Sequence, residues 1–276
     1  MTVEQNVAQH YSHGSLAEAI FAALAKAGIG GERIDADQLA PVDEFHTGGR
    51  QATMEFAEQL AFPKGAHLLD VGSGIGGPAR YFAKHRGCRV SGVDLTEEYV
   101  RVATELTRRT GQAQSVDFRQ GSALALPFAP ATFDGAYMIH VGMNIGDKAA
   151  LFADVRRVLK PGATFGIFDM MRTSEGGDLT FPVPWATTAA TSFVAAPAAY
   201  RRQLTDAGFA VTKERGRRAF AIEFFRTLQA RAAAGEAPPL SLAMVMGADF
   251  PQKIANLRDG LDRGIVEPTE IIGRAV

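Results

Sequence analysis

Leu68-Leu-Asp-Val-Gly-Ser-Gly-Ile-Gly-Gly-Pro78 is the stretch that decides the fold of this 276-residue chain. Residues 67–71 form a short apolar run closed by glycines, which predicts a buried strand, and residues 78–85 have a helical pattern. A strand, a glycine loop and a helix in this order are typical of the turn at which open α/β sheets bind a nucleotide. The sequence therefore predicts a nucleotide-type site beside this loop.

The same alternation continues on the C-terminal side of this stretch. Strands are predicted at residues 67–71, 89–93, 115–119, 135–139 and 163–168. Helices are predicted between them at residues 78–85, 96–109 and 148–159. Strands separated by helices pair in parallel through right-handed crossovers, with helices on both faces of the sheet. The predicted fold class is therefore α/β with a Rossmann-like sheet.

Residues 1–60 are interpreted as an N-terminal helical cap, and residues 61–276 as the core. Ser15 and Glu18 have the spacing of a capping box, which predicts a helix that ends at Gly28. A second helix is expected at about residues 50–60.

The C-terminal third is less regular. A helix is expected at residues 197–207, a strand at 209–214, helices near 220–234 and 250–263, and a last strand at 266–274. Pro268 must then lie at a sheet edge or at the start of that strand. Residues 176–193 are rich in Gly, Pro and Thr and are interpreted as a mobile cover. Together with about 219–263 they are expected to be substrate-cap insertions.

Composition excludes several classes of function. The net charge is −1, from 29 basic and 30 acidic residues, which argues against nucleic acid as a partner. The single cysteine, Cys88, excludes an intramolecular disulfide framework. The N-terminus has no signal-peptide pattern, and no apolar run is long enough to span a membrane. We expect a cytoplasmic protein with a small-molecule substrate.

The glycines of the opening stretch fit two cofactor classes. Gly72, Gly74 and Gly77 match the dinucleotide pattern G-x-G-x-x-G, whereas Gly72, Gly74 and Gly76 match the methyltransferase pattern. Asp70 favours the second, because a carboxylate is unfavourable beside a pyrophosphate but complements an ammonium and a sulfonium. This predicts S-adenosylmethionine as the cofactor and S-adenosylhomocysteine as the product.

Three further positions follow the predicted strands. Asp94 ends the second strand, where an acid accepts hydrogen bonds from a ribose, although NAD would fit equally and an N-cap role is the alternative. Ser122 and Ala123 follow the third strand, where an adenine edge would lie. His140 ends the fourth strand and should face the cleft, where it could orient the cofactor or accept a proton from the substrate. A structural histidine is the alternative for His140.

These motifs, together with Gly-Val-Asp-Leu95, Ala-Leu-Pro-Phe128 and Val-Leu-Lys-Pro-Gly162, resemble those of class I S-adenosylmethionine-dependent methyltransferases. Residues 43–169 are similar to the branch of sarcosine/dimethylglycine, phosphoethanolamine and tocopherol methyltransferases. The resemblance implies a seven-stranded sheet whose last strand is antiparallel. Many relatives have an aspartate where Ser122 stands, and the cysteines of arsenite methyltransferases are absent. The candidate cofactor-binding residues are Asp70, Gly72, Ser73, Gly74, Asp94, Leu95, Ser122, Ala123 and His140.

The acceptor site should come from outside the core. Tyr11, His46 and Trp185 are the candidate substrate-pocket residues, and His140 is the candidate catalytic residue. Phe220, Phe224 and Phe225, at helical spacing, are interpreted as core rather than pocket. Methyl transfer needs no metal, and the sequence contains no clustered metal-ligand motif.

Several alternatives stay open at this point. An amine acceptor is slightly favoured, with C- or O-methylation of a quinol, phenol or lipid precursor next. An NAD-dependent oxidoreductase is the competing enzyme class, and a non-catalytic binding protein is the third class. A homodimer through the variable ends is compatible with the sequence.

Overall fold

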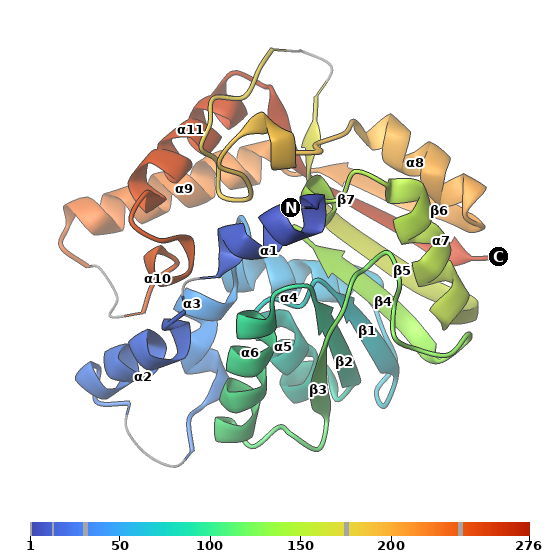
Figure 1. Cartoon of the computed structure of the whole chain (residues 1–276), viewed down its shortest axis with the longest axis horizontal. Helices are drawn as coiled ribbons and strands as arrows, with labels where there is room; N and C mark the ends of the chain where they lie inside the picture. The colour runs from blue at the N-terminus through green and yellow to red at the C-terminus, as the bar shows by residue number, and fades with distance from the viewer. Residues whose placement is uncertain (1, 13, 30–32, 174–176, 237–239) are drawn as a thin grey trace.

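The computed structural model describes residues 2–12, 14–29, 33–173, 177–236 and 240–276, and within them the strands form one seven-stranded sheet. Its order is β3-β2-β1-β4-β5-β7-β6 (Figure 1). The strands are β1 (His67–Val71), β2 (Arg89–Asp94), β3 (Val116–Gln120), β4 (Phe133–Ile139), β5 (Leu159–Arg172), β6 (Phe209–Gly216) and β7 (Val266–Ala275). β1 to β5 pair in parallel, and β7 runs antiparallel to both β5 and β6. The predicted Rossmann-like sheet with an antiparallel last strand is confirmed.

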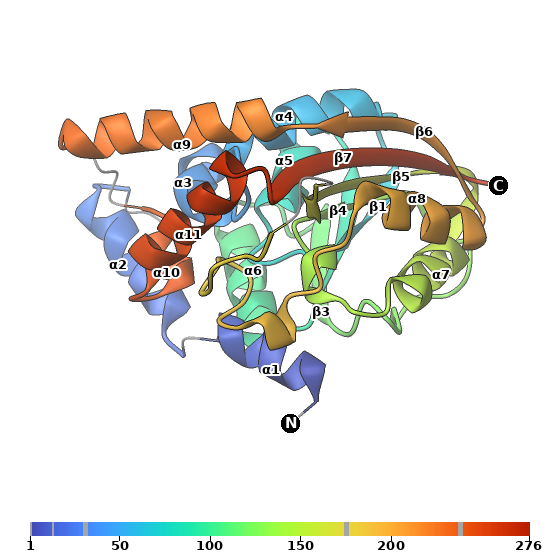
Figure 2. The ribbon, with the colours of Figure 1, turned by 90° about the horizontal axis from the view of Figure 1, so that it is seen from above.

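Helices cover both faces of this sheet. Adjacent residues of a strand point to opposite sides, so each central strand contributes side chains to both buried layers. On one face, Leu68 packs with side chains of α4 (Gly49–Leu60) and α5 (Gly77–Arg86). On the other face, Leu69 packs with side chains of α7 (Lys148–Val158) and α8 (Pro197–Asp206). Figure 2 shows the sheet between these two layers. This burial explains why the central strands are continuous apolar runs.

Pro268 lies near the start of β7, as one of the two predicted alternatives requires. It pairs with Met170 of β5, whereas pairing with β6 begins one residue later, at Thr269. β7 itself is not an edge strand, since β6 covers its other side. Proline is accepted at this position because the β6 ladder has not yet begun there.

The N-terminal helices are α1 (Val3–Tyr11), α2 (Leu16–Lys26), α3 (Ala40–Asp43) and α4. α2 packs against α6 (Glu97–Arg109) through one apolar cluster. The capping box expected at Ser15 does not form, because the Glu98 carboxylate accepts hydrogen bonds from the backbone N–H groups of Gly14 and Leu16, at 2.8 and 3.1 Å. Capping boxes in this region are instead at Thr2 and Gln5, at the start of α1, and at Asp35 and Gln38, at the start of a 3-10 helix (Ala36–Leu39). Glu98 takes over the role of the N-cap because it reaches the helix end from a neighbouring element.

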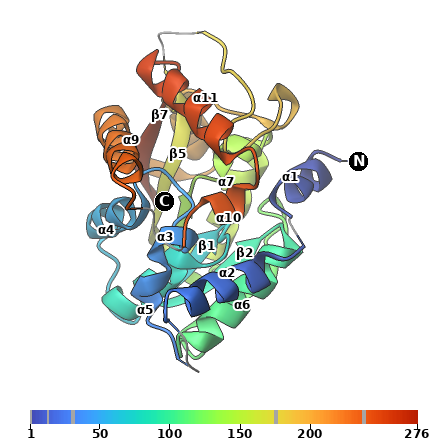
Figure 3. The ribbon, with the colours of Figure 1, turned by 90° about the vertical axis from the view of Figure 1, so that its left-hand side faces the viewer.

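Among the described residues between β6 and β7 there are three helices: α9 (Arg218–Ala233), α10 (Ala243–Met246) and α11 (Phe250–Asp262). Figures 1 and 3 show them gathered with α1, α2 and α3 on the side of the sheet away from the chain's C-terminus. Because β7 is antiparallel, this is the side at which the parallel strands end. Open α/β sheets bind their ligands at these carboxyl ends.

The segment interpreted as a mobile cover is packed at its centre. Residues 174–176 lie outside the described residues. In the described part, 177–193, Val183 and Ala186 form an isolated bridge, and both are buried together with Trp185. They share an apolar cluster with Phe225 of α9 and Leu257 of α11, so this segment is part of the core beneath the cap. The boundaries of a helical cap and of substrate-cap insertions stay a prediction.

In the ranges that the structure describes, no helix combines the length and the apolar composition needed to cross a membrane.

Candidate active site

A cavity of about 1180 Å³ lies over the carboxyl ends of the parallel strands. It is bordered by all predicted site residues except Ser122. These are Tyr11, His46, Asp70, Gly72, Ser73, Gly74, Asp94, Leu95, Ala123, His140 and Trp185. Residues that are up to 174 positions apart in the sequence thus share one cavity.

The glycine loop forms the floor of this cavity. Gly72 and Gly74 both have positive φ angles, 72° and 54°. A side chain on Gly72 would collide with Val141, whereas a Cβ on Gly74 would meet nothing within 4 Å. The loop therefore leaves open space at Gly74, where a ligand can approach the backbone closely.

Asp94 ties this loop to the start of α6. Its Oδ2 accepts a hydrogen bond from the Gly74 N–H at 2.8 Å, and its Oδ1 accepts one from the Thr96 N–H at 2.9 Å. Both interpretations of Asp94 are thus compatible: it borders the cavity and also satisfies a helix N-terminus. Burial raises the pKa of its carboxyl.

Asp70 is buried at the end of β1, and its Oδ2 accepts a hydrogen bond from the Tyr137 hydroxyl at 3.1 Å. Desolvation, with smaller contributions from the neighbouring acids Asp94 and Glu44, raises its pKa to about 8, although the hydrogen bond from Tyr137 opposes this shift. A positively charged ligand group beside Asp70 would restore its charged form.

His140 has a backbone conformation that is uncommon for a residue with a side chain, with φ of 54°. Its ring lies 5.0 Å from that of Phe168 and 5.9 Å from that of His46, between centroids. Its Nε2 is buried without a hydrogen-bond partner among the described residues. Desolvation keeps its pKa well below the ordinary value, so the ring is neutral, and its unpartnered nitrogen is available for a hydrogen bond with a ligand.

His46 lies beside His140 and is held by its own helix entry. Its Nε2 is 3.1 Å from the Gly49 carbonyl and 3.1 Å from Thr53 Oγ1, so this nitrogen carries the proton. Burial lowers its pKa to about 4. The helix-entry role and the cleft role considered from the sequence therefore coexist.

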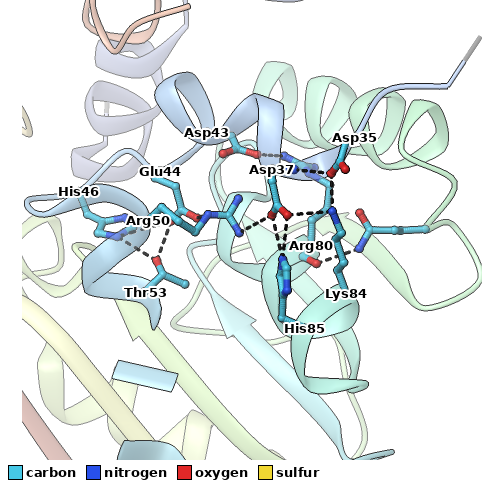
Figure 4. A network of polar contacts seen from close by, with 11 residues as sticks. Asp35, Asp37, Asp43, Glu44, His46, Arg50, Thr53, Arg80, Lys84 and His85 are labelled. Atoms are coloured by element: carbon cyan, nitrogen blue, oxygen red, sulfur yellow. Dashed lines mark hydrogen bonds and ion pairs between the residues drawn. The ribbon is translucent and has the colours of Figure 1, made fainter. Parts of the chain in front are cut away.

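An acidic residue beside His46, Glu44, was not singled out from the sequence. It is buried at the cavity, accepts a 2.6 Å hydrogen bond from the Thr53 hydroxyl, and lies 2.8 Å from Arg50 Nε (Figure 4). Desolvation raises its pKa to about 7. Its neighbour Asp43 forms a fully buried pair with Arg80 at 2.9 Å. Two consecutive acids between apolar residues were the available signal.

A second residue missed by the sequence analysis, Asn144, connects two predicted pocket residues. Its Oδ1 accepts a hydrogen bond from the Tyr11 hydroxyl at 2.9 Å, and its Nδ2 donates one to the Trp185 carbonyl at 2.7 Å. The ring of His10 lies 3.1 Å from both Thr187 Oγ1 and the Pro184 carbonyl. These contacts fix α1 against the segment that carries Trp185.

Ser122 lies next to the cavity, although it does not line it. Its hydroxyl donates a hydrogen bond to the Glu4 carboxylate and accepts one from the Leu124 N–H at 3.0 Å. Glu4 itself lines the cavity. A carboxylate from α1 thus lies against Ser122 at the edge of the cavity.

The cap side of the cavity is largely apolar. Phe224 and Phe225 line it, whereas Phe220 packs over Arg217, with 4.0 Å between its ring centroid and the guanidinium carbon. The interpretation of the three phenylalanines as core holds, since Phe225 belongs to a buried cluster, Phe224 packs against it and Phe220 packs against another, but Phe224 and Phe225 also border the cavity. α10 and α11 contribute Val245, Met246, Ile254 and Leu257.

Within the described ranges, no three His, Cys, Asp or Glu side chains are arranged to hold a metal ion.

Known proteins are similar to part of this chain, and the part that matches a family includes the glycine loop. The family described as Methyltransferase domain matches residues 69–167. Methyltransferase phqN of Penicillium fellutanum is 34% identical over 122 residues, which are 44% of this chain and 37% of that protein. A sterol 24-C-methyltransferase of Gibberella zeae and O-methyltransferase resE of Aspergillus sclerotiorum match over 117 and 118 residues, at 33% and 34% identity. The chain spans less than half the length of these curated relatives.

Two solved structures illustrate the likeness of fold. The geranyl diphosphate C-methyltransferase of Streptomyces coelicolor A3(2) has a TM-score of 0.71 at 16% identity, over 100% of this chain and 98% of that one. Phosphoethanolamine N-methyltransferase 2 of Haemonchus contortus has a TM-score of 0.71 at 20% identity, over 83% of this chain and 53% of that one. These two structures show a likeness of fold, and the predicted resemblance to methyltransferases is confirmed over residues 69–167, which match the Methyltransferase domain family.

Proposed function

We propose that this chain transfers a methyl group from S-adenosylmethionine to a small molecule with an apolar body. The observation that carries the proposal is a single cavity that joins a glycine loop and two buried acids to an apolar cap. Its volume of about 1180 Å³ exceeds that of most single-ligand pockets, roughly 300–1,000 Å³. The cavity therefore has room for a cofactor and an acceptor together.

The residues of the floor suit a cationic nucleoside. Gly74 leaves open space beside the backbone, and Asp70 and Asp94 provide carboxylates on either side of the loop. When bound, S-adenosylmethionine supplies a methyl group that its sulfonium has already activated. We assign Asp70 and the loop Gly72-Ser-Gly74 to its methionine part, and Asp94 with Leu95 to its ribose.

The adenine is assigned to the next strand along the sheet. Ala123 lines the cavity there, and Ser122 lies behind it in contact with Glu4. An NAD-dependent oxidoreductase is the less favourable proposal, because the carboxylate of Asp70 would lie near the negatively charged pyrophosphate of NAD.

Catalysis in this proposal depends on positioning and on the exclusion of water. α1 and the segment that carries Trp185 cover the strand ends and are joined through Asn144. Holding two reactants in line contributes up to roughly 7–11 kcal/mol to lowering a barrier. The neutral His140 offers its unpartnered Nε2 as a proton acceptor, which an oxygen or carbon acceptor requires. An amine acceptor needs only its neutral form.

The similar proteins methylate different kinds of acceptor atom. They include N-, C- and O-methyltransferases. An amine stays our expectation from the sequence, and C- or O-methylation of a quinol, phenol or lipid precursor is the alternative. The apolar cap supports an apolar body whichever atom is methylated.

The test is release of S-adenosylhomocysteine from purified full-length chain and S-adenosylmethionine. The acceptor panel contains glycine derivatives, phosphoethanolamine, phenols, quinols and prenylated acids, and Gly74→Asp serves as the inactive control. A product whose mass rises by one methyl group supports the proposal. Binding of NADH without binding of S-adenosylhomocysteine would overturn it, and cofactor binding with no turnover would favour a non-catalytic binding protein.

Location and assembly are also proposals. We propose a cytoplasmic protein without a nucleic acid partner, and a homodimer is the assembly to test. Cell fractionation checks the first, and light scattering of the purified chain checks the second.

A further inference from the structure

The cap presents two apolar stripes to the cavity. On α9, Phe224 and Leu228 line it, and on α11, Phe250 and Ile254 line it. Residues four apart lie on one face of a helix, so each pair is a continuous stripe. Leu228 is 42% exposed. These stripes offer apolar surface to a ligand.

The stripe on α11 continues to a cation. Arg258 follows Ile254 by four residues, lines the cavity and is half-buried. No hydrogen bond or ion pair joins its guanidinium to another residue in the described parts of the chain. The other cations of this helix are paired: Lys253 with Asp249 at 3.0 Å, and Arg263 beyond its C-terminus with Asp259 at 2.8 Å.

Apart from Asp70, which lies at the glycine loop and accepts a hydrogen bond from Tyr137, and Glu236, the acids that line the cavity are engaged by other residues. Asp43 pairs with Arg80, Glu44 with Arg50, and Asp94 accepts two backbone hydrogen bonds. Asp147 caps α7, and Glu4 binds Ser122.

Two more charges border the cavity at the end of α9. Arg231 and Glu236 are both exposed, so water solvates them. Arg258 differs from them because it is half-buried beside apolar side chains. A partly desolvated guanidinium without a counter-ion is unfavourable, and its planar fork matches a carboxylate or phosphate. The missing anion can come from a ligand.

We propose that the methyl acceptor is an anionic amphiphile. Its apolar body lies between the stripes of α9 and α11, and its carboxylate, phosphate or sulfonate pairs with Arg258. This inference rests on the proposed function, because it names the substrate class of the same cavity. The acceptor would thus be distinguished from neutral molecules of equal size by one charge-assisted pair.

The test uses binding alone and does not require turnover. The neutral fluorophore N-phenyl-1-naphthylamine is bound to the full-length chain and displaced by dodecanoate or by dodecanol, which have the same tail. We expect dodecanoate to displace it at a concentration at least about tenfold lower, the ratio for a charge-assisted pair. Arg258→Gln should bring the two concentrations together, and Arg258→Lys should keep part of the difference.

Arg263→Gln is the matched control, because Arg263 follows the same helix but is exposed and paired with Asp259. It should keep the wild-type ratio. Equal displacement by both compounds in the wild type, an unchanged ratio in Arg258→Gln, or no binding of the fluorophore would each overturn the proposal. Calorimetric binding of S-adenosylhomocysteine to the same samples reports on the proposed function separately, and Arg258→Gln should leave it unchanged.

Discussion

Buried ionisable side chains surround the cavity, and desolvation is the largest influence on each of them. It raises the pKa of Asp70 to about 8 and that of Glu44 to about 7, and it lowers the pKa of His46 to about 4. Without a ligand, these groups are therefore biased toward their neutral forms. A cationic ligand shifts the two acids back toward the charged form, so its binding is coupled to proton release.

Asp70→Asn tests this coupling through stability. In the free protein the folded-state pKa of Asp70, about 8, lies above its ordinary value of 3.8. Between these values the folded form holds a proton that the unfolded form releases, so stability falls as pH rises from about 4 to 8. One such group contributes a slope of up to about 1.4 kcal/mol per pH unit. We expect the free energy of unfolding of Asp70→Asn, measured in urea from pH 5 to 8, to fall less steeply than that of the wild type. Equal slopes would contradict the prediction.

Gly74→Asp should abolish binding of S-adenosylmethionine. Its side chain would enter the open space at the loop and place a negative charge beside the ligand carboxylate. A residue other than glycine at φ of 54° also costs about 1 kcal/mol. Gly65→Asp is the matched control, since Gly65 also has a positive φ, 84°, and open space around it but does not line the cavity. Calorimetry should find loss of affinity in the first variant only, and affinity retained in Gly74→Asp would show that the loop does not hold the cofactor.

Individual residues differ in how far the sequence predicts their position. Asp70, Gly74 and Asp94 belong to a local pattern of strand, loop and strand end, and this pattern alone places them at the cavity. Glu44 and Asn144 could not be found in that way, because their partners lie on other elements. Their roles depend on contacts with Arg50 and Tyr11 that only the assembled chain creates.

At the scale of elements, α1 is held by few contacts. Val7 is the one buried residue of α1 among those described, Tyr11 packs against Phe45 and Tyr99, and polar contacts through Glu4, His10 and Tyr11 fix the rest. Elements with little buried apolar surface open at low free energy. α1 is therefore the element most suited to admit the ligands.

Tyr11→Phe should make α1 open more often. The variant keeps the ring, whose centroid is 6.1 Å from that of Phe45, but loses the hydrogen bond to Asn144. One hydrogen bond contributes about 1 kcal/mol, so amide hydrogen exchange of α1 should accelerate about fivefold. Exchange in α6 should stay unchanged in the same samples. Identical exchange of α1 in both proteins would show that Asn144 does not hold the helix.

The predicted strands are close to those observed because a buried strand has a strong apolar pattern. β5 is the informative exception, since it extends to Arg172 rather than to residue 168. Asp169, Met170, Met171 and Arg172 pair with the first residues of β7, about 100 positions away. The length of β5 is thus set by its neighbour, and no local pattern could predict it. The cap gives a similar case. Periodicity predicted its helices, but their position over the cavity depends on contacts with other elements.

For the whole molecule, the only tryptophan reports on the state of the cavity. Trp185 is 2% exposed, lines the cavity and donates a hydrogen bond to Ser192 Oγ at 2.9 Å. We expect blue-shifted emission and weak acrylamide quenching in the free protein, and a change of emission when dodecanoate fills the cap side. Trp185→Phe should remove the signal without preventing binding of S-adenosylhomocysteine. Strong quenching in the free protein would contradict the buried position of this ring.

The place of β7 in the sheet has a consequence for synthesis of the chain. β6 is an edge strand whose single neighbour is β7, and β7 also covers the outer side of β5. A ribosome makes β5 and β6 first, and then residues 217–265, before β7 emerges. During this interval both earlier strands have unpaired edges, which are the usual starting points of aggregation. The nascent protein therefore depends on a late insertion, and destabilising changes in β7 should reduce the yield of folded protein more than equal changes in β3.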